Sequence, residues 1–251
     1  MKTSLRMKTS LRSHKALLKW SFLRHRYLFV SFTVLQIMFA LAIVYGLTLM
    51  LDMSGGQSAQ NVNTGVWQLC LITIGCNLAP QMMAGSISEG FMEYQSNLPV
   101  SRVGILLSDW LIWALVSAPG VAAAILAGWA RFGLVPQNPG LLILLLLLCM
   151  LVNLSFGYTM ALWFPPDTVT IVGQAVMFVA MLFSPILYSS DKLPHFIVAF
   201  HNCLPFVPMH RLILAAAFPG SSQMNWPDLA VVLVWLFACS GICMAGLYKR
   251  K

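Results

Sequence analysis

Two carboxylates, Glu89 and Glu93, lie one helical turn apart in a short polar segment between two long apolar stretches. The segment covers residues 85–102 and reads GSISEGFMEYQSNLPVSR. Side chains four residues apart share a face of a helix, so both glutamates would present their negative charge in one direction. No catalytic grouping lies near them, so the expected chemistry is ionic docking. We therefore interpret this segment as a surface that receives force from a soluble partner.

Sequence motifs for catalysis and for nucleotide binding are absent. The chain has no GxxxxGK[ST] phosphate loop, no HExxH, no GxSxG and no convincing Ser/His/Asp set. We therefore expect a protein that is not an enzyme and binds no cofactor of its own. His195, His201 and His210 gather in one segment and raise the alternative of zinc, but solvated or structural histidines are favoured. Cys239 and Cys243 are one turn apart without a second ligand pair, so we expect no metal site.

The composition excludes an ordinary soluble domain. Of the 251 residues, 59% are hydrophobic and 9% are charged, and the mean hydropathy is +0.80. Soluble domains carry about a quarter charged residues, and a soluble surface could not hide this much apolar side chain. A helix that spans a bilayer needs about 20 apolar residues. The chain therefore has room for about six spans and is expected to be a multi-pass membrane protein.

The apolar pattern predicts an all-α membrane protein with a single transmembrane domain over residues 1–251. Proline, glycine and polar clusters separate the apolar runs, as expected at helix ends. The cluster at residues 52–65 holds glycine, serine and asparagine but no Lys or Arg, so we expect an external loop there. Residues 189–227 hold apolar stretches that are too short to span and are broken by proline, so we expect external re-entrant helices there. The six predicted spans are residues 28–51, 66–84, 104–129, 141–163, 168–188 and 229–248.

The basic residues predict the orientation. Eight of them precede Tyr27, and with Arg102 and three at the C-terminus twelve fall on the side assigned to the cytoplasm. Three fall on the other side, namely Arg131, Lys192 and Arg211. This bias follows the positive-inside rule and places both termini in the cytoplasm. It also makes the net charge of +8 a membrane signature, so we expect no nucleic-acid partner.

The basic segment 1–27 ends in an amphipathic pattern. Within residues 13–27 the leucines and Phe22 fall on one helical face, and Lys15, Lys19 and Arg26 lie largely on the other. The favoured interpretation is a helix that lies in the inner membrane interface. The alternative is a basic flank of the first span.

Polar side chains in the second and fifth predicted spans are candidates for a transport path. Thr73, Asn77 and Gln81 are spaced by four and share one helical face. Thr170 and Gln174 are one turn apart in the fifth span, and Phe178 follows after another turn. Polar groups that face lipid are costly, so these faces are expected to meet protein or water. For each single residue, ordinary contact between helices remains the favoured alternative.

Several blocks of the chain resemble the ABC-2 permease family, the membrane subunits of bacterial ABC exporters. The likeness lies in GSISE and GFME, then in LPVSR, which ends at Arg102, and in GILLSDWL after it. The proline-rich stretch SPILYSSDKLPHFIVAFHNCLPFVPMHRLI is similar to the family's outer element before the last span. Phe91 and the pair Ser108–Asp109 depart from the family pattern.

The resemblance implies a mechanism and partners. A separate ABC ATPase subunit would bind ATP and magnesium, and two permease copies would pair, with a homodimer expected, in the plasma (inner) membrane. Residues 86–102 would be the coupling segment, with the coupling helix from Glu89 to Asn97. The residues that it assigns to ATPase coupling are Glu89, Gly90, Met92, Glu93, Tyr94, Pro99 and Arg102.

The expected cargo is an amphipathic drug, peptide or lipid-like molecule, because the predicted spans carry few charges. Three alternatives remain, and one is a scaffold or sensor subunit that transports nothing. The second is a polysaccharide or glycolipid exporter of the same family. The third is an intramembrane transferase, which would need polar or metal-binding residues at one membrane depth.

Overall fold

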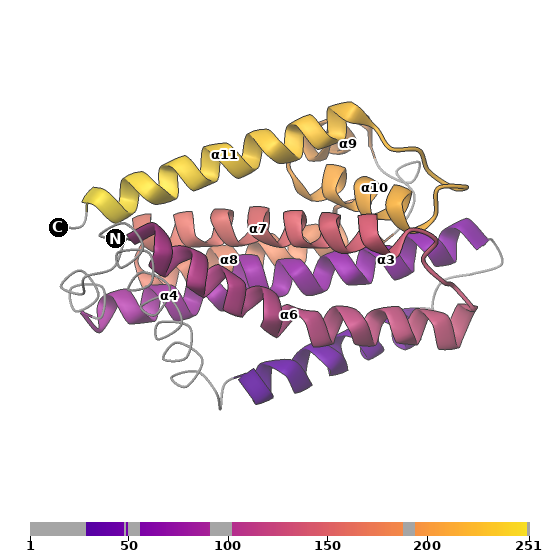
Figure 1. Ribbon diagram of the computed structural model, residues 1–251, viewed down its shortest axis with the longest axis horizontal. Helices are drawn as coiled ribbons and strands as arrows, with labels where there is room; N and C mark the ends of the chain where they lie inside the picture. The colour runs from indigo at the N-terminus through magenta and orange to yellow at the C-terminus, as the bar shows by residue number, and fades with distance from the viewer. Residues whose placement is uncertain (1–28, 48, 50–55, 91–101, 188–193, 250–251) are drawn as a thin grey trace, which may run out of the picture.

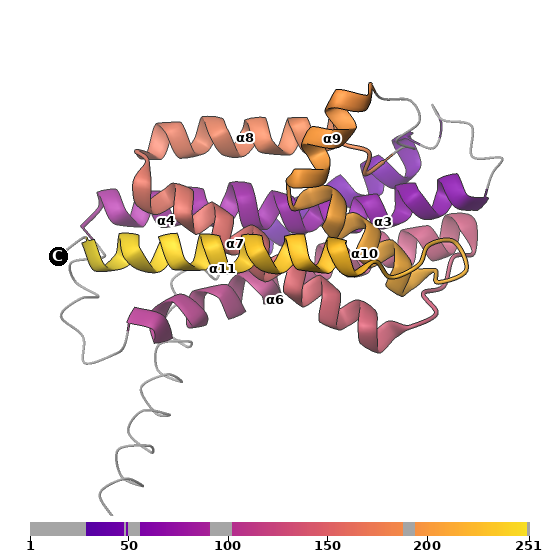
Figure 2. The same cartoon turned by 90° about the horizontal axis from the view of Figure 1, so that it is seen from above.

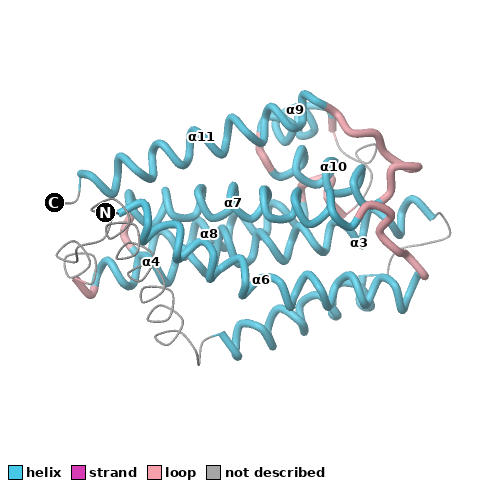
Figure 3. The backbone as a smooth tube through the Cα atoms, in the orientation of Figure 1, coloured by secondary structure: helices cyan, strands magenta, loops and turns pink. Residues whose placement is uncertain are grey.

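The computed structural model describes residues 29–47, 49, 56–90, 102–187 and 194–249, and every regular element in this part of the chain is a helix. The helices run mostly alongside one another in an elongated bundle (Figures 1 and 3). The first is an apolar helix, Phe29–Gly46, which ends in the π-helix η1 (Ala42–Leu47). The others are α3 (Gly56–Ile72), η2 (Thr73–Leu78), α4 (Ala79–Ser88), α6 (Arg102–Phe132), α7 (Pro139–Trp163), α8 (Pro166–Leu182), α9 (His195–Cys203), α10 (Phe206–Ala217) and α11 (Trp226–Lys249).

The second predicted span is longer than its apolar pattern indicates. α3, η2 and α4 form one continuous helix, Gly56–Ser88, of 33 residues, whereas the sequence predicted residues 66–84. Glycine, serine and asparagine had indicated an external loop before residue 66. Those residues are helical because tertiary packing covers them, and Asn63 and Thr64 are fully buried. Burial against neighbouring helices thus overrides the local preference of polar residues for loops.

α7 lies at the centre of the bundle and contacts α11, η2, α4 and α10. Its closest crossing is with η2, where two glycines let the backbones meet. A Cβ on Gly157 would overlap the carbonyl oxygen of Gly75, and a Cβ on Gly75 would lie 2.5 Å from Cβ of Asn153. Small residues at such crossings are typical of helix packing within membranes, because close backbone approach increases van der Waals contact.

The fifth predicted span is shorter than expected. The sequence predicted residues 168–188, but α8 ends at Leu182 and has 17 residues, fewer than the roughly 20 that cross a bilayer. The chain then turns through Ser184 and Pro185, and this turn packs against α3. A Cβ on Gly65 of α3 would lie 2.5 Å from the carbonyl oxygen of Ile186.

Two short helices follow, α9 and α10, with a bend of 80° between them. Proline was expected to break this segment, and Pro205 lies at the break. α10 is buried along nearly its whole length. By length and composition five helices could cross a membrane, or six if α9 and α10 count as one broken span. The fold is therefore that of a multi-pass membrane protein.

The bundle has two ends that hold different connections (Figures 1 and 2). At the first, α4 ends, α6 begins, α7 turns into α8, and α11 ends. We call it the inner end, because the orientation predicted from the basic residues places it on the cytoplasmic side. There Lys249 places its Nζ 5.0 Å from the ring centre of Trp163. At the second, the outer end, α6 turns into α7, and α9 and α10 pack near the start of α11. Segment 13–27 lies outside the described residues.

Candidate coupling and pathway site

The coupling segment begins with a helix stop at the inner end. α4 ends at Ser88, and Gly90 adopts a φ of 74°. The backbone amide of Gly90 donates to the carbonyl oxygen of Ile87 at 3.1 Å, and that of Glu89 donates to Gly85 at 3.1 Å. A left-handed glycine that closes the last turn is a common helix C-cap, because glycine has no Cβ to clash. The helix therefore stops beside an exposed residue, Glu89.

The other predicted coupling residues lie largely outside the described part of the chain. Met92, Glu93, Tyr94 and Pro99 fall in the undescribed stretch 91–101, and Arg102 is described only as the first residue of α6. Ser86, at the predicted start of the coupling segment, is instead a buried residue of α4 that donates to Met82. The helical part of the span therefore extends closer to Glu89 than the predicted boundary at residue 84.

The three predicted pathway residues of the second span lie together. The side-chain amide of Gln81 donates to Oδ1 of Asn77. The hydroxyl of Thr73 and the amide nitrogen of Asn77 approach the sulfur of Met177 on α8, at 3.9 and 4.0 Å. Thr73 and Asn77 are buried. In this structure Met177 covers Thr73 and Asn77, so these two side chains face protein rather than open water.

The predicted pathway residues of the fifth span point elsewhere. Thr170, Gln174 and Phe178 lie on the exposed side of α8, where Phe178 is 55% exposed. The opposite side of α8 faces η2, because a Cβ on Gly173 would lie 2.8 Å from the carbonyl oxygen of Cys76. The structure therefore does not bring the two predicted polar sets together within one chain.

Sequence reasoning missed a buried polar face on α3, in the stretch that was predicted to be an external loop. Asn63, Thr64 and Gln68 are fully buried, together with Gln36 of the first helix. Gln36 donates to the carbonyl oxygen of Cys70 at 2.9 Å. The spacing of Gln60, Thr64 and Gln68 by four residues was the signal that could have revealed a helical face.

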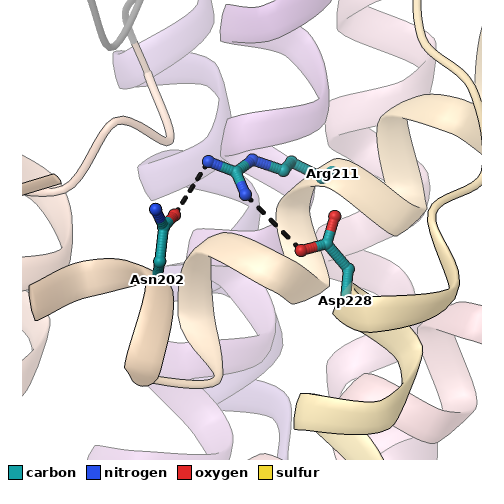
Figure 4. A network of polar contacts seen from close by, with 3 residues as sticks. All are labelled: Asn202, Arg211 and Asp228. Atoms are coloured by element: carbon teal, nitrogen blue, oxygen red, sulfur yellow. Dashed lines mark hydrogen bonds and ion pairs between the residues drawn. The ribbon is translucent and has the colours of Figure 1, made fainter. Parts of the chain in front are cut away.

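A second missed cluster lies at the outer end (Figure 4). Arg211 of α10 donates to Asn202 of α9 at 2.8 Å, and its other terminal nitrogen lies 3.4 Å from a carboxylate oxygen of Asp228 on α11. One guanidinium thus joins three helices, which the fork geometry of arginine permits. Nearby, Nε2 of His210 lies 3.0 Å from the hydroxyl of Thr64. That hydroxyl donates to the backbone carbonyl oxygen of Gln60 at 2.8 Å, and Nε2 also lies 3.4 Å from the carbonyl oxygen of Asn61, so the imidazole acts as the donor.

These histidines do not form a metal centre in the described residues. No group of three or more His, Cys, Asp or Glu side chains that could hold a metal ion occurs there. His201 is buried on α9, whereas the side chain of His195 is not among the described parts of the structure. The zinc alternative thus finds no ligand set in the part of the chain that the structure describes.

The comparison with known families agrees with this architecture. A search among curated proteins returned no match. The chain matches the family of ABC-2 type transporters over residues 14–218, a range that includes the first five spans predicted from sequence, the coupling segment and both short outer helices. With an all-helical apolar bundle and a match that covers most of the chain, this protein belongs to the ABC-2 type transporter family and is a membrane component of a transporter.

Proposed function

We propose that the chain is the permease subunit of an ATP-driven exporter, and that it moves an amphipathic drug, peptide or lipid-like molecule out of the cytoplasm. Family membership implies association with an ABC ATPase subunit. The observation that carries the proposal further is the capped end of α4 at Gly90, which presents Glu89 at the surface of the inner end.

The ATPase subunit binds ATP and magnesium and docks on the coupling segment, chiefly from Glu89 to Asn97. Glu89 and Glu93 pair there with basic groups, and Gly90 fixes the angle at which the segment leaves α4. Because η2 and α4 form one helix with α3, a push at the inner end is transmitted along the bundle axis. ATP drives the change only if it binds the closed state of the ATPase more tightly than the open state.

A second copy of the chain completes the transport path. Thr170, Gln174 and Phe178 lie on an exposed face of α8, and leaving Gln174 against lipid is unfavourable. In a homodimer this face of α8 in one copy packs against the same face in the other copy. Thr73, Asn77 and Gln81 then line the path when α8 and Met177 move away from η2.

The character of the path favours an amphipathic cargo without strong charge. Residues 73–81 and 168–182 contain no Asp, Glu, Lys or Arg, so a highly charged cargo would find no fixed counter-charge. The family alternative, a polysaccharide or glycolipid exporter, would favour an aromatic-lined channel. The transferase alternative rests on the histidines, of which His210 is engaged with Thr64.

Purification with the ATPase subunit tests the proposal most directly. We expect the chain, expressed with an ABC ATPase subunit from the same organism, to purify as a complex whose ATP hydrolysis is stimulated by cargo. Purification without an ATPase, or hydrolysis that no amphipathic compound changes, would argue for a scaffold or an enzyme.

Replacing Gly90 with alanine is expected to weaken coupling. A residue with a Cβ in the left-handed region is strained by about 1–2 kcal/mol, so the turn after α4 shifts. Transport should fall about tenfold while the amount of protein in the membrane is unchanged. Gly85→Ala is the matched control, because a Cβ there meets nothing within 4 Å. Equal transport by both variants would exclude a role for this turn.

Cysteine at position 174 is expected to cross-link two copies of the chain. The background is Cys203→Ser, because Cys203 is the exposed cysteine among the described residues. In membranes treated with a short bifunctional thiol reagent, Gln174→Cys should give a covalent dimer. Val234→Cys, on the exposed side of α11, should give none. A dimer through Val234→Cys alone would move the interface to α11.

A further inference from the structure

One half of the circumference of α3 carries polar side chains that are buried in the bundle, except for Gln60 at its edge, which is half-buried. On a helix of 3.6 residues per turn they fall on one side, opposite Val62, Val66 and Leu69. Residues 56–72 contain no Asp, Glu, Lys or Arg. We call this side the polar arc, and its members are Gln60, Asn63, Thr64, Trp67 and Gln68.

Two helices cover the polar arc. From α10, His210 donates to Thr64, and the sulfur of Met209 lies 3.5 Å from the amide nitrogen of Gln68. From α6, Gly128 packs on Asn63 so closely that a Cβ there would overlap the side-chain amide. α10 thus lies over the arc as a lid, and α6 forms a wall beside it.

Many hydrogen-bonding atoms of the arc have no protein partner. Among the described residues these are both amide atoms of Asn63, Nε1 of Trp67, Oε1 of Gln68 and Oε1 of Gln60. Asn63, Trp67 and Gln68 are fully buried. Unpartnered polar atoms in a membrane-spanning helix are costly, because the bilayer supplies no hydrogen bonds. The number of unpartnered polar atoms on this one face indicates that a ligand forms hydrogen bonds with them.

The chemistry of the arc defines that ligand. Its unpartnered atoms include donors, Nδ2 of Asn63 and Nε1 of Trp67, as well as acceptors, Oδ1 of Asn63 and Oε1 of Gln68. A ligand that serves them must both donate and accept, must carry no charge and must be small. Water meets all three conditions, and buried waters typically make two to four such bonds.

We infer that the polar arc is an internal water-binding site whose lid is α10, and that water enters when α10 separates from α3. His210 and Met209 of α10 contact Thr64 and Gln68 directly in this structure, so separation of α10 from α3 creates space over these side chains. The site lies on a face of α3 that the predicted pathway residues do not share, and it goes beyond the proposed function.

The cluster of Arg211, Asn202 and Asp228 holds the lid in place (Figure 4). Arg211 lies one residue after His210, and it ties α10 to α9 and α11 at 2.8 and 3.4 Å. Asp228 is nearly buried, with 8% of its side chain exposed, whereas Arg211 is 38% exposed. Besides its contacts with α3, α10 is thus tied to α11 by one partly exposed ion pair, and loss of this pair weakens its attachment.

Hydroxyl-radical footprinting of the unmodified chain in membranes tests the site. Radicals form from water, so a buried methionine is oxidised only where water reaches it. Met209 and Met150 are equally buried, with exposures of 0% and 1%, but only Met209 contacts the arc. We expect Met209 to be oxidised about fivefold faster than Met150. Equal rates would overturn the inference.

Releasing the ion pair tests the lid. Asp228→Asn keeps the shape of the side chain, and we expect it to raise oxidation of Met209 about fivefold with Met150 unchanged. Asp167→Asn at the inner end is the control. A rise at Met150 equal to that at Met209 would indicate general loosening and would contradict a lid. An unchanged oxidation rate of Met209 in Asp228→Asn would also contradict a lid.

A measurement with and without trapped nucleotide separates this inference from the proposed function. The water site itself does not depend on the proposed function, but its response to ATP does. In membranes that contain the ATPase subunit, trapping the nucleotide state with vanadate should change the oxidation of Met209. Fast oxidation that ignores nucleotide would leave the water site intact and would count against ATP-driven opening.

Discussion

Gly157→Ala is expected to disrupt the centre of the bundle and to lower the amount of folded protein sharply. The added Cβ would overlap the carbonyl oxygen of Gly75, a backbone atom that cannot rotate away. Overpacking of a core costs about 1–3 kcal/mol, and a clash with rigid backbone falls at the upper end. The helices that meet at this crossing, α7 and η2, must move apart, which also separates α7 from α4. Thermal unfolding of the purified protein in detergent measures the effect.

The matched control for this change is Gly140→Ala on the same helix. A Cβ on Gly140 meets nothing within 4 Å, and alanine is the better helix former by about 1 kcal/mol. Gly140→Ala should therefore unfold at the temperature of the parent or slightly above it. If Gly157→Ala unfolded at that temperature too, the close crossing of α7 and η2 would be wrong.

Glu89→Lys combined with Glu93→Lys is expected to uncouple ATP hydrolysis from transport. If both carboxylates face basic groups of the ATPase, charge reversal turns attraction into repulsion. Like charges brought together at an interface cost several kcal/mol, so binding of the ATPase should weaken about a hundredfold. Purification through the ATPase measures the complex, and hydrolysis and efflux in vesicles measure coupling.

Charge-conserving changes are the control for this experiment. Glu89→Asp with Glu93→Asp shortens both side chains but keeps their charge, so the complex should persist and transport should fall far less. Because the repulsion is partly screened by salt, high ionic strength should restore part of the binding of the lysine variant. Survival of both hydrolysis and efflux in the lysine variant would rule out docking through this segment.

The sequence predicted the class of fold well, because the bilayer imposes it. Long apolar runs can be satisfied only as helices that bury their backbone hydrogen bonds, and α6, α7 and α11 lie close to the predicted residues 104–129, 141–163 and 229–248. It also located the proline break between α9 and α10. The order of helices, the polar segment after α4 and the family resemblance all followed from the order of residue types.

Boundaries set by contacts were predicted less well. Polar residues before Val66 indicated a loop, but their burial against α10 and α6 makes them part of α3. α8 was expected to reach residue 188 because its apolar character continues, yet it ends at Leu182 where the chain turns onto α3. Local composition cannot show which polar side chain another helix will cover.

The candidate sites also have some features that the sequence predicted and others that depend on tertiary contacts. Sequence alone determined that the chain is a multi-pass membrane protein with Glu89 and Glu93 after its second span, because apolar length and charge spacing are local properties. Only the tertiary structure decided that Thr73 and Asn77 face Met177 while Gln174 lies outside, and that Arg211 joins α9, α10 and α11. The physical reason is that the rotation of each helix and its partners depend on packing between residues far apart in the chain.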